Sequence, residues 1–231
     1  MIEWRKSLLE ELKGFAAPRV VSMKDLTEMA ERVRPGVHRQ SVYLLSRAFE
    51  DGGTLLPVRR GLWLNASAFP APSVAEAASR IRSGAVVSLQ TVLGDAGVLN
   101  NFASQVYCVL PVPEKGPNPS LAPVDAADTR IHFRGMRQDV LEAGDREDRL
   151  NPLVPYPRAT AEAALVHWFY LAHVQRSQME EPDTQCDVSM LDLERLARLA
   201  AAAGVADEAA AWVERCRRRE EDDAQERGWG P

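Results

Sequence analysis

Several features that define common protein classes are scarce or missing in this chain of 231 residues. Aromatic residues make up only 6% of it, and it has three cysteines, Cys108, Cys186 and Cys216. No run of about 18 uncharged apolar residues occurs, which argues against a membrane-spanning helix. An odd number of widely spaced cysteines is typical of a reduced protein rather than of a disulfide scaffold. The first residues also lack the apolar stretch of a secretion signal. We therefore expect a cytoplasmic protein with no membrane partner.

Motifs of the common catalytic and cofactor sites are missing as well. The sequence contains no Gly-rich phosphate loop and no H-E-x-x-H, C-x-x-C or G-x-S-x-G pattern. His167 and His173 lie six residues apart, which places them on different faces of a helix and argues against a shared metal ion. Asp145, Glu147 and Asp148 form a charge run of the kind usual in a solvated turn. We expect no catalytic residue, no metal and no cofactor.

What the chain does have is an apolar fraction of 45%, enough for a core, and an uneven distribution of charge. The net charge of −5 argues against a nucleic-acid binder when it is taken over the whole chain. Residues 1–65, however, carry 11 Lys and Arg against 8 Asp and Glu, whereas residues 66–231 carry 17 against 25. A small basic part therefore precedes a larger acidic part.

The basic part has the pattern of three helices followed by a β-hairpin. Apolar residues at helical spacing, from Ile2 to Phe15, predict an amphipathic helix over residues 2–16. Ser22 and Asp25 form a capping box for a second helix that ends at Pro35-Gly36. A third helix is predicted over residues 37–50. Two β-prone runs around Arg59-Arg60-Gly61 predict a hairpin, in which Pro57 restricts its strand to an edge or an irregular position.

This order is that of a winged helix-turn-helix, a fold that places one helix in the DNA major groove. Residues 1–66 are accordingly predicted to form a DNA-binding domain, with residues 37–50 as the recognition helix and Arg59-Arg60 as the tip of the wing. Arginine can bind guanine or phosphate, and glutamine can pair with adenine. The expected DNA-binding residues are His38, Arg39, Gln40, Ser41, Tyr43, Arg47, Arg59 and Arg60.

The remainder, residues 67–219, predicts a mixed α/β domain that ends in helices. Strands are expected over residues 105–110 and 129–134. Thr160 is expected to cap a helix over residues 161–176, which is apolar nearly all round and therefore buried. Two further helices are predicted on either side of Gly204, followed by a flexible charged tail over residues 220–231. The predicted fold class is thus α+β and mostly helical.

Three stretches of this sequence resemble a known family. They are Pro57–Leu64, Ala85–Val98, which contains V-S-L-x-x-x-L-x-x-x-G, and Ala159–Leu171, which is similar to A-S/T-P-E-x-A-L-x-D-x-x-Y-L. Over roughly residues 20–200 the chain resembles the AbiE-type antitoxins of type IV toxin–antitoxin systems. The chain departs from the family pattern at Ala161, where proline is usual, and at His167, where aspartate is usual.

The resemblance implies two activities. The N-terminal winged helix would repress the protein's own operon by binding inverted repeats in double-stranded DNA, as a homodimer or as separate monomers. The C-terminal domain would counter a nucleotidyltransferase-like toxin, directly or functionally. Two alternatives stay open at this point: a protein-interaction module with a degenerate helix-turn-helix and an acidic partner-binding domain, and, less favoured, an enzyme with a divergent carboxylate site.

Overall fold

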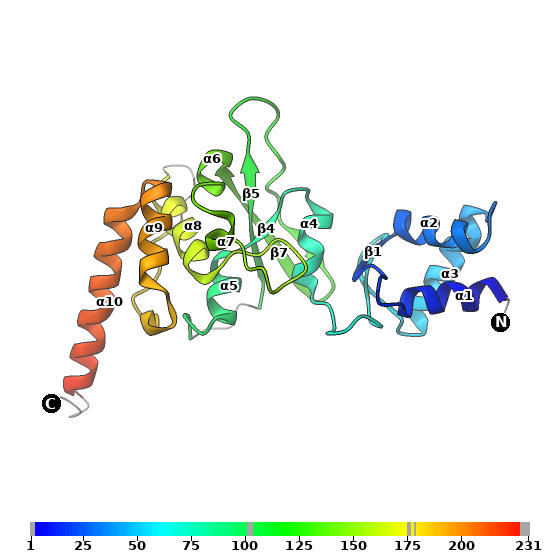
Figure 1. The fold of residues 1–231 in the computed structure, drawn as a ribbon, viewed down its shortest axis with the longest axis horizontal. Helices are drawn as coiled ribbons and strands as arrows, with labels where there is room; N and C mark the ends of the chain where they lie inside the picture. The colour runs from blue at the N-terminus through cyan, green and yellow to red at the C-terminus, as the bar shows by residue number, and fades with distance from the viewer. Residues whose placement is uncertain (1–2, 101–103, 175–176, 178, 227–231) are drawn as a thin grey trace. The chain divides into compact units, whose positions relative to one another are not determined.

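The computed structural model of this protein describes residues 3–100, 104–174, 177 and 179–226. It has an α+β fold with two separate sheets, as the sequence predicts (Figure 1). The chain divides into two compact units: an N-terminal unit of Met1–Ile81 with Asp125–Thr129, and a C-terminal unit of Arg82–Val124 with Arg130–Pro231. Each unit has its own sheet and its own buried side chains.

The N-terminal unit contains three helices that pack through their apolar faces. They are α1 (Glu3–Lys13), α2 (Met23–Val33) and α3 (Arg39–Asp51). The predicted capping box of α2 is confirmed, because the Ser22 hydroxyl accepts the Asp25 N–H and the Asp25 carboxylate accepts the Ser22 N–H. This exchange satisfies two backbone donors that a helix start leaves open and fixes where α2 begins.

A three-stranded sheet completes this unit. Its strands are β1 (Val20–Ser22), β2 (Leu55–Arg59) and β3 (Leu62–Asn65), in the order β1-β3-β2 with antiparallel pairing. The predicted position of Pro57 is confirmed, since β2 is an edge strand and its register shifts between Pro57 and Arg59. A residue without a backbone N–H is tolerated at such a place.

The core of the N-terminal unit differs from the prediction at two positions. Phe15 lies beyond the end of α1 and is fully exposed, whereas Trp4, one turn before Leu8, is buried instead. In α3, Ala48 is exposed and Ser46 is buried. The members of this core are Trp4, Leu8, Leu12, Val21, Leu26, Met29, Ala30, Val42, Leu45, Phe49, Leu55 and Trp63.

The N-terminal unit extends beyond residue 66, where the sequence analysis set its boundary. A 3₁₀ helix, η1 (Val74–Ala77), and α4 (Ala78–Ile81) belong to it. The buried Glu76 carboxylate accepts hydrogen bonds from Arg19 Nε at 2.8 Å and Arg19 Nη2 at 2.9 Å. Because such a two-pronged ion pair is strong and directional, it holds residues 67–81 against the strand region of this unit.

The C-terminal unit is built on a four-stranded sheet in the order β4-β5-β7-β6. Strand β4 (Val86–Val87) runs antiparallel to β5 (Val106–Val112), and β5 runs parallel to β7 (Thr129–Arg137). The fourth strand is β6 (Val124–Ala126), of which Asp125 and Ala126 are counted with the N-terminal unit. Strands β5 and β7 fall where the sequence predicts them and are longer than expected.

The rest of this unit is helical. Its helices are α5 (Leu89–Asp95), α6 (Gln138–Leu141), α7 (Arg146–Arg149), α8 (Ala161–His173), α9 (Leu193–Ala203) and α10 (Ala206–Glu226), with a 3₁₀ turn η2 (Val188–Met190) before α9. Helix α8 contacts α5, α7, α9 and α10. The Thr160 cap of α8 is confirmed by its hydrogen bond from the Ala163 N–H. The predicted burial of α8 is confirmed on nearly every side.

The last helix is longer than expected. The sequence analysis ended it at Arg219, but α10 continues to Glu226, through part of the predicted charged tail. Residues 227–231 of that tail lie outside the described residues. Within the part of the chain that the structure describes, no helix is both long enough and apolar enough to cross a membrane.

Candidate nucleic-acid interface

Helix α3 presents a polar face because its apolar face is held in the core. Val42, Leu45 and Phe49 are buried at helical spacing. His38 caps the helix, and its Nδ1 accepts the Gln40 N–H at 3.3 Å. Since side chains three and four apart share a face, the opposite side of α3 carries Arg39, Gln40, Tyr43 and Arg47, all of them exposed.

The turn between β2 and β3 supplies the other predicted residues. Arg59 is the last residue of β2, and Arg60 and Gly61 form the turn. Gly61 has φ +77°, a conformation that favours glycine over residues with a Cβ. Both arginines are exposed.

The face of α3 and the β2–β3 turn border one hollow of about 1100 Å³, which we call the basic hollow. Ser41, one of the eight predicted residues, does not line it: this residue is half-buried, and its N–H donates to the His38 carbonyl at 2.8 Å. The lining residues are Met23, His38, Arg39, Gln40, Tyr43, Arg47, Glu50, Pro57, Val58, Arg59, Arg60, Gly61, Trp63, Asp125 and Ala127. The structure thus brings together seven of the eight, from two segments of the chain.

The charge of the hollow is positive. Its lining includes four arginines against the two carboxylates of Glu50 and Asp125. Glu50 is engaged locally, because its Oε1 accepts the Trp63 indole N–H at 2.5 Å and its Oε2 lies 3.4 Å from Arg47 Nη1. Glu50 and Trp63 are not among the residues that the sequence predicts for this site. The i, i+3 spacing of Arg47 and Glu50 could have indicated the ion pair, but no local signal indicates the indole.

In the C-terminal unit, the three carboxylates of the charge run lie in different environments. They are Asp145, Glu147 and Asp148. Asp148 is an ion-pair partner of two helix α9 residues, Arg195 at 3.3 Å and Arg198 at 3.0 Å. Glu147 is exposed in a different hollow, of about 560 Å³, and Asp145 occupies the capping position of α7. The charge of Asp148 is thus neutralised by the two arginines. Among the described residues no three His, Cys, Asp or Glu side chains gather as they would around a metal ion.

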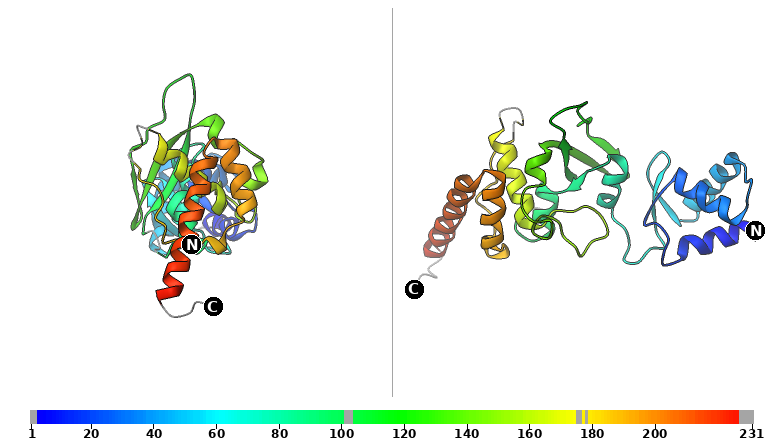
Figure 2. Two further views of the ribbon diagram at one scale, coloured as in Figure 1. Left: turned by 90° about the vertical axis from the view of Figure 1, so that its left-hand side faces the viewer. Right: turned by 45° about the horizontal axis from the view of Figure 1, so that its top comes forward.

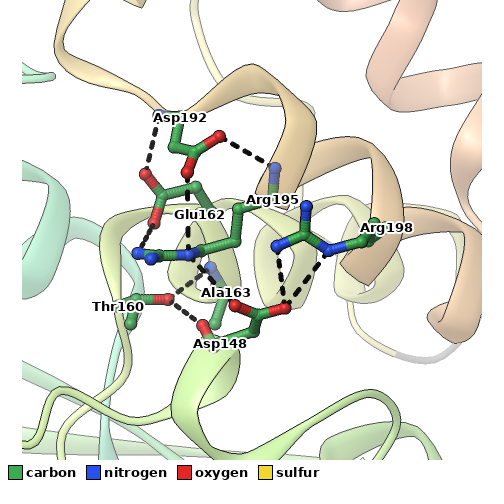
Figure 3. Close-up of polar contacts among 7 residues, drawn as sticks. All are labelled: Asp148, Thr160, Glu162, Ala163, Asp192, Arg195 and Arg198. Carbon is green, nitrogen blue, oxygen red and sulfur yellow. Dashed lines mark hydrogen bonds and ion pairs between the residues drawn. The ribbon is translucent and has the colours of Figure 1, made fainter.

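Glu162, from the third family-like stretch, Ala159–Leu171, has a structural role at the same place (Figure 3). Its side chain is buried, its Oε1 accepts the Asp192 N–H at 2.9 Å, and its Oε2 lies 3.6 Å from Arg195. Arg195 therefore lies between Glu162 of α8 and Asp148 of α7. The network fixes the start of α9 against α8, because a buried carboxylate without partners would be strongly unfavourable.

His167, the residue that departs from the family pattern, is also buried. Its Nδ1 lies 2.8 Å from Ser88 Oγ, and Ser88 belongs to the V-S-L stretch. The second and third family-like stretches, Ala85–Val98 and Ala159–Leu171, therefore meet at this hydrogen bond. Burial, with a smaller effect of the nearby Arg149 charge, lowers the pKa of His167 to about 3, so the imidazole is neutral near pH 7.

The three thiols are buried as well. Burial raises the pKa of Cys108 and of Cys186 to about 12, and that of Cys216 to about 11. A thiol must lose its proton to act as a nucleophile. Cys108 is a fully buried core residue of β5.

These observations describe a two-unit α+β protein whose N-terminal unit presents a positively charged hollow. No protein-family model and no curated protein matches the chain. Among solved structures, it is similar to the crystal structure of the RV2827C protein from Mycobacterium tuberculosis, with a TM-score of 0.50 and 18% sequence identity. The match covers 89% of this chain and 77% of that one. At this identity the likeness concerns the fold alone.

The burial of His167 generates a pH prediction. A histidine in the unfolded chain binds a proton near pH 6.5, whereas folded His167 does not until the pH approaches about 3. The unfolded state therefore binds more protons below pH 6.5, and the free energy of unfolding should fall as the pH drops, by up to about 1.4 kcal/mol per pH unit. Urea titrations between about pH 7 and pH 5 should show a shallower decline for His167→Gln, which cannot titrate. Equal slopes for the two proteins would contradict a neutral, buried His167.

Proposed function

We propose that the N-terminal unit is a winged helix-turn-helix that binds double-stranded DNA, with α3 as the recognition helix and the β2–β3 turn as the wing. The observation that carries the proposal is the basic hollow. Residues chosen from sequence alone as DNA contacts, in two separate segments, line a single positively charged hollow. If these residues were only a solvated surface, there would be no reason for the two segments to line the same hollow.

The side chains of the hollow suit different parts of a DNA duplex. Arg39 and Gln40, in the first turn of α3, would contact base edges in the major groove, where arginine pairs with guanine and glutamine with adenine. His38, which lines the hollow, and Ser41, which lies outside it, are both at the N-terminus of α3, which favours a phosphate. Arg59 and Arg60, at the tip of the hairpin, would contact phosphates or the minor groove.

The ion pair and the indole hydrogen bond of Glu50 support this assignment by orienting Arg47. Glu50 receives Trp63 Nε1 on one oxygen and Arg47 on the other. Because Trp63 is buried in the core, the carboxylate is held in one place and directs the Arg47 guanidinium along the polar face of α3. A pre-positioned arginine loses less conformational freedom when it binds DNA.

For the whole chain we propose a cytoplasmic autorepressor that also acts as the antitoxin of a type IV system, binding operator inverted repeats and countering a nucleotidyltransferase-like toxin. The support is the resemblance to AbiE-type antitoxins. In the C-terminal unit, Glu162 and His167 are buried and engaged internally. These two side chains would therefore shape the antitoxin domain rather than contact a toxin.

The DNA proposal predicts the effect of removing two side chains from α3. Arg39→Ala with Gln40→Ala should abolish specific operator binding, because the contacts to base edges are lost, while the fold is retained. The matched control is Lys6→Ala with Ser7→Ala on α1, which removes the same charge and one polar group from outside the basic hollow. A gel-shift titration with the upstream region of the gene measures both. Full sequence-specific affinity in the α3 variant would refute this face as the interface.

If the β2–β3 turn acts as the wing, its arginines should contribute to the salt dependence of DNA binding. If Arg59 and Arg60 each neutralise one phosphate, replacing both with alanine should reduce the slope of log K against log [salt] by up to about two. Lys6→Ala with Lys13→Ala changes the net charge equally and should leave the slope unchanged. Fluorescence anisotropy at several salt concentrations measures the slope. An unchanged slope in the Arg59 and Arg60 variant would exclude the hairpin tip from the interface.

The antitoxin proposal predicts rescue of growth. Co-expression of this chain with the product of the adjacent gene, where that gene encodes a nucleotidyltransferase-like protein, should relieve toxicity. The variant Arg39→Ala with Gln40→Ala should rescue equally when the toxin is expressed from an independent promoter, because antitoxin activity resides in the C-terminal unit. Failure of the unmodified chain to rescue would refute the antitoxin role and leave DNA binding as a separate question.

A further inference from the structure

Helix α10 is anchored to its unit along one face only. Trp212 is fully buried, its Nε1 donates to the Pro182 carbonyl at 2.9 Å, and its ring meets Phe169 edge-on at 5.6 Å. Cys216, one turn further on, is also buried. With 21 residues, α10 is longer than the neighbouring 11-residue α9, and its C-terminal end extends beyond α9 (Figure 1; Figure 2, left). The opposite face of α10 is exposed.

The charges on α10 are ordered in two blocks. Four arginines, Arg215 and Arg217–Arg219, are followed directly by four carboxylates, Glu220–Asp223. Carboxylates near the C-terminus of a helix interact unfavourably with its dipole, so this order does not stabilise α10 on its own. Within the helix, Arg219 Nε lies 3.9 Å from Asp223 Oδ2, so this i, i+4 pair compensates one of the four carboxylates.

Part of these charges is already paired within the chain. Arg215 bonds Glu181 at 2.6 Å, Arg218 bonds Glu214 at 3.0 Å, and Arg219 contacts Asp183. Arg217 and Glu221 differ from these. Both are exposed, they lie four residues apart on one face, and neither forms an ion pair within the described part of the chain.

We propose that this face of α10 docks antiparallel against α10 of a second copy of the chain, with the two-fold axis at the level of Arg219. In an antiparallel pair, residues equally distant from the axis oppose each other. Arg217 then faces Glu221 of the second copy, and Glu221 faces Arg217 of the second copy. Two-fold symmetry makes every such contact twice.

The surface beside Arg217 suits a helix packed in this way. Helices α9 and α10 border a hollow of about 490 Å³, which ends at Arg217 and is lined by Leu193, Leu196, Ala197, Ala206, Asp207, Ala209, Ala210, Val213, Glu214 and Arg217. With the axis at Arg219, Glu214 faces Ala224 of the second copy and Val213 faces Gln225 of the second copy. The second copy's α10 would therefore reach the end of this hollow next to Arg217, where small side chains such as alanine permit a short distance between helix axes.

The order of the charges is what selects a second copy as the occupant. A partner surface of a single sign would attract one block of α10 and repel the other. An antiparallel copy of the same two blocks places positive against negative in both halves. Since the ion pairs are exposed, the dimer should be weak and should dissociate as salt is added.

Sedimentation equilibrium of the full chain at low and at high salt tests the proposal. We expect a monomer–dimer equilibrium at low salt that shifts to monomer at high salt. Arg217→Glu and Glu221→Arg should each raise the dimer dissociation constant about tenfold or more, because each replaces two attractive contacts with two repulsive ones. Asp222→Arg is the matched control: it makes the same charge change as Glu221→Arg at the next residue, turned away from the proposed contact.

Two further samples separate the proposed pairing from a general loss of stability. An equimolar mixture of the Arg217→Glu chain and the Glu221→Arg chain should dimerise again, because one chain is acidic at both positions and the other basic. The double variant Arg217→Glu with Glu221→Arg should also dimerise. A monomer at all concentrations, single variants that dimerise normally, or a mixture that stays monomeric would each overturn the proposal.

Discussion

The C-terminal unit depends on the need to cover α8 on every side. Its 13 residues are apolar nearly all round, and the sheet, α5, α7, α9 and α10 supply the surfaces around it. Two ionisable residues within it, Glu162 and His167, can be buried only because partners reach them. Arg195 and the start of α9 satisfy Glu162, and Ser88 at the start of α5 satisfies His167. Both polar contacts therefore also determine where the neighbouring helices begin.

The N-terminal unit is organised differently, because its helices are apolar on one face only. Their apolar sides share a core with the three-stranded sheet, which leaves the opposite face of α3 free. A free polar face can take up a ligand without disturbing the core that holds it. One unit thus uses helix burial to fix its shape, whereas in the other the amphipathic helices leave polar side chains of α3 exposed to solvent.

Features that depend on neighbouring residues were predictable from the sequence. The capping box at Ser22, the cap at Thr160, the edge position of Pro57 and the burial of α8 all follow from patterns within a few residues. Features that depend on contacts between residues far apart in the sequence were not predictable in this way. The boundary after residue 66 was misplaced because the ion pair of Arg19 with Glu76 joins residues 57 apart. The length of α10 was underestimated because acidic residues near a helix end suggest fraying. The same distinction holds at the basic hollow, where the polar face of α3 follows from helical spacing but the bond from Trp63 to Glu50 requires the folded sheet.

The burial of the three cysteines has a practical consequence for work on this protein. With a pKa of about 11 or 12, fewer than roughly one thiol in ten thousand is ionised at neutral pH. Alkylating reagents and mild oxidants attack the thiolate, so the native chain should be nearly inert to them. A single cysteine introduced at an exposed position could then carry a fluorophore or a cross-linker without first removing the natural ones. The distance between the two units, which the fold of each does not determine, could be measured in this way.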